Sequence, residues 1–365
     1  MSNTDKSSGN QKFNEDRSKD KYSSRYQRLI NILLYAKEIP NDLYKHLNMS
    51  YDNFRKTVSI LNQRGILKRL YKDGTLGYVL NDKNLTSHLD YMKYRDCLED
   101  DRRQYDIKHR SRKRQFAYLY ALFDRIGIPY ESFSKPPITE VPVSGKMIYF
   151  YTAHDFKRML GMESTGFTGS RLLGFLIGCD KVIPVYRTNR ALKSFGSQET
   201  LVPLYLKRYF TVTPDTAILI CDDEKALITI TNQIVYNTDT NLHTGINTAQ
   251  YRIFYVMPSD DTFYNRLYDL HIDRTGVEDG VIKIFEVNTS ETDRLGRYRY
   301  KAGTGFLKDN TPVLIYAGNV NVVTLRAFIY YAESNDIESC ILCKPRDCRA
   351  LREITKGRPI RVIAF

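Results

Sequence analysis

The chain has no apolar run long enough to cross a bilayer and no segment with the features of a signal peptide. Only six of its 365 residues are cysteine, and their irregular spacing does not indicate a disulfide framework in a chain of this length. We therefore expect a cytoplasmic protein that has no membrane partner.

Several enzyme motifs are also missing. None of the six histidines forms the His-hydrophobe-His pair of metal-dependent relaxases and rolling-circle initiators. The glycines from Gly161 to Gly174 lack the phosphate-loop spacing that is followed by Lys and Ser or Thr. Cys340 and Cys343 have Cys348 nearby but no fourth ligand close in sequence, so we expect buried thiols and no metal site.

What the sequence does contain is positive charge. The formal net charge is +13 and the sequence pI is about 9.3, which favours a polyanionic partner. The length suffices for two domains, each with its own core. Residues 1–22 are polar and of mixed charge, and they predict a disordered arm ahead of the first domain.

Residues 23–82 have the clearest pattern. Apolar residues at helical spacing predict a first helix, followed by a second, short helix capped by Asn41. Ser50 begins a third helix, and Gly65 ends it. Two apolar runs joined by Asp73-Gly74 then predict a hairpin. This order of helices and hairpin predicts a winged helix, a variant of the helix-turn-helix domain.

A winged helix places its third helix in the DNA major groove and its hairpin, the wing, on the backbone. The same fold also serves in protein contacts, but the basic exposed face favours DNA here. The residues that point away from the apolar face of the third helix are the predicted groove contacts, and the basic residues of the hairpin are the predicted phosphate contacts. The groove set is Arg55, Lys56, Ser59 and Gln63, and the phosphate set is Lys68, Arg69 and Lys72. Tyr51 and Asn53 are further predicted DNA contacts on the third helix.

Residues 83–127 predict a basic connector helix. Lys and Arg are concentrated between residues 101 and 115, and apolar residues at helical spacing follow. The basic run either extends the DNA footprint or forms a solvated connector, and the sequence leaves both open. We include Arg110, Arg112, Lys113 and Arg114 among the predicted DNA contacts.

Residues 128–365 predict an α/β domain, because apolar strands alternate with helices, which indicates a partly parallel sheet. One predicted strand, Val281–Val287, carries Glu286, and Asp279 precedes it. Two carboxylates at a strand end are the Mg²⁺ ligands of one nuclease fold, although Asn288 stands where that fold has a lysine. The alternative interpretation is that both are ordinary surface acids.

The order of these parts resembles the replication-relaxation family of plasmid and integrative-element proteins. Three segments carry the resemblance: ILKRLYKDGTLGYVL at the hairpin, KHRSRKRQFAYLYALFDRIGIPYE at the connector, and IKIFEVNTSETDRLGRYRYKAG after Asp279. The resemblance implies a winged helix, a helix and then a degenerate restriction-endonuclease-like α/β domain. It also implies a place among mobilisation accessory proteins, which act in the relaxosome during conjugation.

Together, these features predict an accessory protein of a mobile genetic element that binds double-stranded DNA. It would act at an origin of transfer or replication with a relaxase or a replication initiator, and its α/β domain would bind that partner or form a homodimer. Two alternatives stay open. One is a nuclease that uses Asp279 and Glu286 with Mg²⁺, the only cofactor any of these hypotheses needs. The other is a winged-helix transcriptional repressor.

Overall fold

The computed structural model describes the chain in several stretches. They are residues 25–72, 74–81, 110–141, 147–159, 171–188, 190–192, 195, 197–210, 214–236, 251–271, 275–290 and 303–365. The predicted disordered arm, residues 1–22, lies outside the described residues, as do Asp73 and the connector segment 83–109.

The chain is a mixed α and β protein with two compact units, Met1–Lys135 and Pro136–Phe365. The sequence predicts the boundary between residues 127 and 128, whereas in the structure it lies between Lys135 and Pro136. Packing of aromatic side chains explains the difference. Tyr130 stacks on Tyr120 with ring centroids 4.4 Å apart, and its ring also meets Tyr35 edge-on. Residues beyond 127 therefore still contribute to the core of the N-terminal unit.

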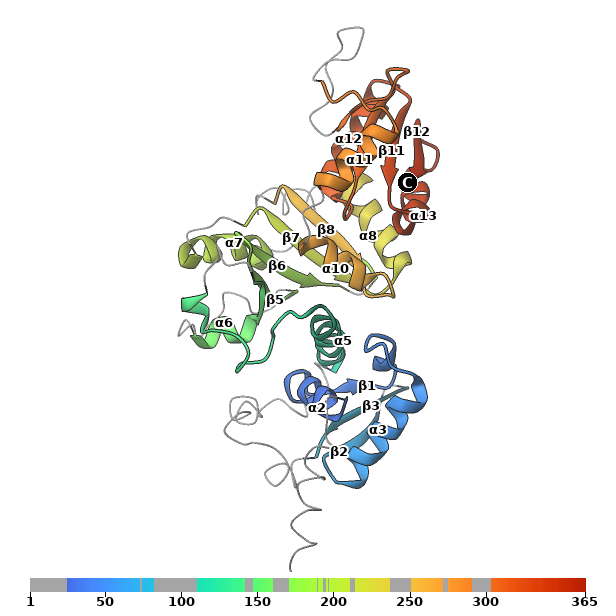
Figure 1. Cartoon of the computed structure of the whole chain (residues 1–365). Helices are drawn as coiled ribbons and strands as arrows, with labels where there is room; N and C mark the ends of the chain where they lie inside the picture. The colour runs from blue at the N-terminus through green and yellow to red at the C-terminus, as the bar shows by residue number, and fades with distance from the viewer. Residues whose placement is uncertain are drawn as a thin grey trace, which may run out of the picture. The chain divides into compact units, whose positions relative to one another are not determined.

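In the described part of the N-terminal unit, helices surround a small antiparallel sheet (Figure 1). The sheet has the order β1-β3-β2. The predicted first and third helices and the predicted hairpin are confirmed. In chain order the elements are α2 (Arg25–Ala36), β1 (Ile39–Pro40), the 3-10 helix η1 (Leu43–Lys45), α3 (Tyr51–Gln63), β2 (Leu67–Lys72), β3 (Thr75–Leu80) and α5 (Arg110–Ile126).

Local signals in the sequence account for α3 and the hairpin. The Ser50 hydroxyl accepts a hydrogen bond from the backbone N–H of Asn53, so it caps α3 as predicted. Gly65, after α3, has a φ of +70°, and Gly74, in the hairpin turn, has a φ of +69°. Glycine reaches this left-handed conformation without the steric cost of a Cβ, which explains both positions.

The predicted helix cap at Asn41 is wrong. The second helix is only the 3-10 turn η1, and its N-cap residue, Asp42, makes no capping hydrogen bond with its side chain. The Asn41 side chain instead accepts a hydrogen bond from the Tyr78 hydroxyl, 2.9 Å away. This connection is therefore fixed by β3 rather than by a helix end.

The helix α5, predicted as part of a connector, packs within the N-terminal unit. It contacts α2, β1 and η1, and Leu119, Tyr120 and Phe123 on it are buried. The Tyr118 hydroxyl donates a hydrogen bond to the Asp42 carboxylate at 2.7 Å. The described part of the predicted connector thus completes the core of this unit.

The first sheet of the C-terminal unit has the strand order β4-β5-β6-β7-β8. The pairs β4–β5 and β5–β6 are antiparallel, whereas β6–β7 and β7–β8 are parallel, so the predicted partly parallel sheet is confirmed. Its strands are β4 (Tyr149–Thr152), β5 (Leu172–Gly178), β6 (Lys181–Arg187), β7 (Thr216–Cys221) and β8 (Ile253–Pro258), and its helices are α6 (Ala153–Met159), α7 (Ser197–Phe210), α8 (Glu224–Tyr236) and α10 (Phe263–His271).

A second sheet in this unit has the order β12-β11-β10-β9. Strands β10, β11 and β12 of this sheet run parallel to one another, and β9 pairs antiparallel with β10. The helix α8 of the first sheet packs on the helices α12 and α13 of the second. The two sheets therefore share a helical layer. The elements are α11 (Thr275–Ile284), β9 (Gly305–Phe306), β10 (Pro312–Tyr316), α12 (Val322–Ser334), β11 (Ser339–Cys343), α13 (Pro345–Ile354) and β12 (Ile360–Ala364).

The strand predicted at Val281–Val287 is wrong, because most of this segment belongs to the helix α11. Its β-branched residues are typical of a strand, but Val281 packs from a helix on Val313 and Ile315 of β10. The helix stops at Ile284, and Glu286 then adopts a φ of +52° in a turn. Tertiary packing has overridden the local preference here.

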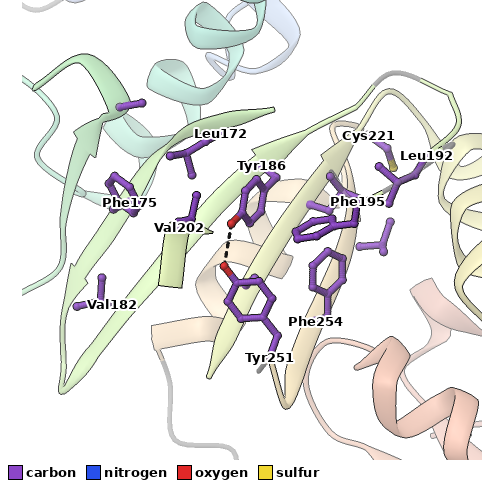
Figure 2. Packing of buried hydrophobic residues seen from close by; sticks show 14 of the residues in the cluster. Leu172, Phe175, Val182, Tyr186, Leu192, Phe195, Val202, Cys221, Tyr251 and Phe254 are labelled. Atoms are coloured by element: carbon purple, nitrogen blue, oxygen red, sulfur yellow. Dashed lines mark hydrogen bonds between the residues drawn. The ribbon is translucent and has the colours of Figure 1, made fainter. Parts of the chain in front are cut away.

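Aromatic side chains fill the core of the five-stranded sheet. Figure 2 shows the hydroxyls of Tyr186 and Tyr251 directed at one another, beside Phe195 and Phe254. The two oxygens are 2.7 Å apart, and both tyrosines are buried. Within the described stretches, no helix combines the length and the apolar character needed to cross a membrane.

We expect Tyr186→Phe to lower the free energy of unfolding by about 2 kcal/mol, because it leaves the buried Tyr251 hydroxyl without its partner. The double variant Tyr186→Phe/Tyr251→Phe should lose less, because no buried hydroxyl is left without a partner, and the donor to the Glu199 backbone oxygen is lost equally in both variants. Urea denaturation followed by circular dichroism measures both. The exposed Tyr330→Phe is the matched control, and a single variant as stable as this control would contradict the prediction.

Candidate nucleic-acid interface

The exposed face of α3 contains the four predicted groove contacts and the two further predicted DNA contacts of this helix. Phe54, Thr57, Val58 and Leu61 are buried on the opposite face, which leaves the other side of the helix to solvent. Tyr51 is 46% exposed although it is aromatic. The exposed set is Tyr51, Asn53, Arg55, Lys56, Ser59 and Gln63, and the helical wheel predicts the exposure of the last four.

Positive charge dominates α3 and the strand that follows it. Residues 51–72 contain six Lys or Arg residues and a single acid, Asp52. Among the residues that the structure describes, no acidic side chain forms an ion pair with Arg55, Lys56 or Arg69. No acid of the described stretches therefore neutralises these three charges, which favours a polyanion as their partner.

The hairpin β2–β3 has two different faces, because side chains alternate along each strand. On one face, Arg69 pairs across the strands with Tyr78, and Tyr71 pairs with Leu76. We call this the α3 face, because the Tyr78 ring lies 6.2 Å from the ring of Phe54 on α3. The other face, the α5 face, carries Lys68, Leu70 and Lys72 on β2 and Gly77 and Val79 on β3.

The α3 face brings the charges of the helix and the hairpin together. Burial raises the pKa of the Tyr78 hydroxyl, whereas the positive charges of Arg69 on β2 and Arg55 on α3 lower it. Both arginines therefore lie close enough to this hydroxyl to influence its pKa. Arg55 and Tyr51 on α3 and Arg69 on β2 are all exposed.

The α5 face is occupied by a buried ion pair. The Arg110 guanidinium donates through Nε to the Glu38 carboxylate at 2.8 Å, and both side chains are almost fully buried. Its remaining N–H groups donate to the carbonyl oxygens of Leu70, Lys72 and Thr75, which surround the hairpin turn. One side chain of α5 thus fixes both strands of the hairpin.

Gly77 makes this pair possible. A methyl group at Gly77 would overlap the Oε1 atom of Glu38 and crowd the Arg110 guanidinium. Burial raises the pKa of the Glu38 carboxyl, and the hydrogen bond and charge of Arg110 lower it without cancelling that rise. The pair therefore carries a desolvation penalty that only its close geometry offsets.

The predicted phosphate contact at Arg110 is wrong, because its side chain is only 5% exposed and its donors are engaged. The other basic residues at the start of α5 are partly buried. Arg112 lies over the Phe116 ring, and burial lowers the pKa of its guanidinium. Arg114 pairs with Asp42 at 3.9 Å, and Lys113 remains partly exposed. Arg112, Lys113 and Arg114 therefore stay predicted DNA contacts.

The candidate nuclease residues, Asp279 and Glu286, do not lie together on a strand. Asp279 is exposed on α11, and Glu286 lies in the turn after that helix, where it pairs with Lys308. In the described part of the chain, no three His, Cys, Asp or Glu side chains group closely enough to hold a metal ion. Metal-dependent cleavage of the predicted kind requires an acid at the end of a strand, whereas Glu286 follows the helix α11.

The cysteines of β11 are buried as expected. Cys340 packs with Val313 and Leu342, whereas Cys343 packs with a different cluster on the other face of the sheet. Burial raises the pKa of the Cys340 thiol to about 11. Two thiols on opposite faces of one strand cannot be joint ligands of one ion.

A buried charge cluster in the C-terminal unit was not predicted from the sequence. Arg266 on α10 pairs with Asp347 on α13 at 2.6 Å, and Asp269 pairs with Lys344 at 2.7 Å. Asn319 donates a hydrogen bond to the backbone oxygen of Arg266. The cluster ties α10 of the first sheet to α13 of the second. Its members are too far apart in sequence to form a recognisable motif.

In comparisons with known proteins, no family model matches this chain, and it has no significant match among curated proteins or solved structures.

We expect Arg110→Ala to lower the free energy of unfolding of the N-terminal unit by about 3–5 kcal/mol, because Glu38 is left buried and unpaired. Chemical denaturation followed by circular dichroism tests this. Arg69→Ala, which removes an exposed arginine from the adjacent strand, is the control and should change stability by less than about 0.5 kcal/mol. Equal losses in the two variants would show that Arg110 does not fix the hairpin.

Proposed function

We propose that the N-terminal unit is a winged helix that binds double-stranded DNA, with α3 as the helix that enters the major groove. The observation that carries this proposal is the exposed basic face of α3 beside the α3 face of the hairpin. In a winged helix the third helix and the wing contact the same duplex, and the contact between Phe54 of α3 and Tyr78 of β3 supports this assignment.

The exposed side chains of α3 suit the reading of bases, and the positive charge of the chain suits binding to phosphates. Arg and Lys side chains reach guanine O6 and N7 in the major groove, and Asn and Gln side chains reach adenine. Arg55, Lys56 and Gln63 supply these groups from one helix face. The net charge of +13 supplies the attraction to phosphates that makes such binding strong and salt-dependent.

The wider role is that of an accessory protein of a mobile genetic element, acting at an origin of transfer or replication. The resemblance of the hairpin and α5 segments to the replication-relaxation family supports this role, whereas the third segment gives no support because its expected strand is a helix. The partner is a relaxase or a replication initiator, and the C-terminal α/β unit, which that family likeness makes a degenerate restriction-endonuclease-like domain, binds it or a second copy. A repressor would differ in the position of its sites, which would overlap a promoter rather than an origin.

The double variant Lys56→Ala/Gln63→Ala removes two of the predicted hydrogen-bonding groups from the groove. It should bind its specific duplex more weakly, by about 1–3 kcal/mol for each base that these side chains recognise. Duplexes from the gene's own neighbourhood serve as probes in fluorescence anisotropy. Lys207→Ala, which removes one exposed lysine from α7 of the C-terminal unit, is the control and should bind like the parent.

The same titration should be repeated with and without Mg²⁺, and its products run on a denaturing gel. We expect intact DNA in both cases, because Glu286 follows a helix, pairs with Lys308 and belongs to no group of three potential metal ligands among the described residues. Unchanged affinity and specificity in the double variant would exclude α3 as the element that reads the groove. Cutting that requires Mg²⁺ and is abolished in Glu286→Ala would favour a nuclease.

A further inference from the structure

Tyr71 is the most exposed tyrosine of the described N-terminal unit. It is 74% exposed, one residue before the end of β2, and its cross-strand partner is the partly buried Leu76. Lone exposed aromatic residues are common on protein surfaces. This one differs because it lies on the α3 face, on the same side of the ribbon as Arg69 and as Tyr78, whose ring meets Phe54 of α3.

The opposite side of the ribbon is closed to a large ligand near its turn. Glu38 and Arg110 cover Gly77 there, and the guanidinium reaches the carbonyl oxygens on both sides of the turn. Lys68 and Lys72 alternate onto this α5 face rather than onto the face that carries Arg69. The three basic residues of β2 are therefore not equivalent.

We infer that the hairpin contacts the duplex through its α3 face alone, with Tyr71 and Arg69 on the sugar-phosphate backbone. The Tyr71 ring packs on a deoxyribose while its hydroxyl donates to a phosphate oxygen, and Arg69 pairs with a neighbouring phosphate. Lys68 and Lys72 take no part in the contact. This inference rests on the proposed function, because it assumes that α3 lies in the major groove.

Physical chemistry favours tyrosine for this contact. Its ring offers apolar area with little rotamer entropy to lose, and its hydroxyl satisfies a polar neighbour at the edge of that contact. Tyrosine hydroxyls and arginines are both common donors to DNA phosphates. Arg110 fixes the backbone of the ribbon from which the two side chains project, so the ribbon itself needs little ordering on binding.

The contact positions the protein without reading bases, because phosphates and sugars are the same at every step of the duplex. Removal of the Tyr71 side chain should therefore weaken binding to all sequences by a similar factor. Removal of the Lys56 and Gln63 side chains should instead weaken the specific duplex more than an unrelated one. These two patterns separate the role of the hairpin from the role of α3.

The experiment measures duplex affinity of the full chain at several salt concentrations for Tyr71→Ala, Tyr71→Phe and Arg69→Ala. We expect affinity to fall about tenfold for Tyr71→Ala and by less for Tyr71→Phe, which keeps the ring but not the hydroxyl. Arg69→Ala should also reduce the slope of log affinity against log salt by about 1, whereas Tyr71→Ala should leave that slope unchanged.

Lys68→Ala and Lys72→Ala are the matched controls, since they alter the opposite face of the same strand. Each should change affinity by no more than about twofold near physiological salt. Weaker binding in these two variants, with Tyr71→Ala and Arg69→Ala unaffected, would overturn the inference while the proposed function stands. A parent protein that binds no duplex at all would overturn both. Circular dichroism of each variant verifies that the exposed substitutions leave the fold intact.

Discussion

The arrangement of the N-terminal unit depends on the buried ion pair between Arg110 and Glu38. Two charges removed from water lose much of their hydration energy, and the attraction between them offsets this loss only when every remaining donor finds a partner. Arg110 meets that condition through carbonyl oxygens of both hairpin strands. Because burial still raises the pKa of Glu38, the pair adds less to net stability than its short distance suggests. Its main effect is geometric, since it holds β1, the hairpin and α5 in one relation.

That geometry decides which side of the hairpin is available to a ligand. On the α5 face the pair lies directly over Gly77, so no other group fits there. On the α3 face Tyr78 packs on Phe54, which sets the hairpin against α3. An exposed basic surface that is supported from behind by packed aromatic and charged groups needs little reordering on binding. The buried residues thus fix the position of the hairpin and α3, and the exposed residues of the candidate interface project from these fixed elements.

The elements of this interface could be predicted because their signals are local. The cap at Ser50, the left-handed Gly65 and the turn at Gly74 each follow from one residue's own conformational preference. The role of Arg110 could not be predicted in the same way. It stands in a basic run typical of a solvated helix, and its partner Glu38 is 72 positions away. The segment ending at Glu286 shows the complementary limit, because its β-branched residues favour a strand whereas packing on β10 selects a helix.

The position of Arg110 in the chain also has a consequence for synthesis. During translation the whole hairpin leaves the ribosome before Arg110 does, so the carbonyl oxygens around its turn first meet water instead of a guanidinium. The hairpin reaches its final surroundings only after the start of α5 has emerged. A fragment that ends after β3 lacks this side chain permanently, and Glu38 in it is deprived of the cation that pairs with it. The smallest piece of the chain that can fold as a complete N-terminal unit therefore extends through α5 to the stacked ring of Tyr130.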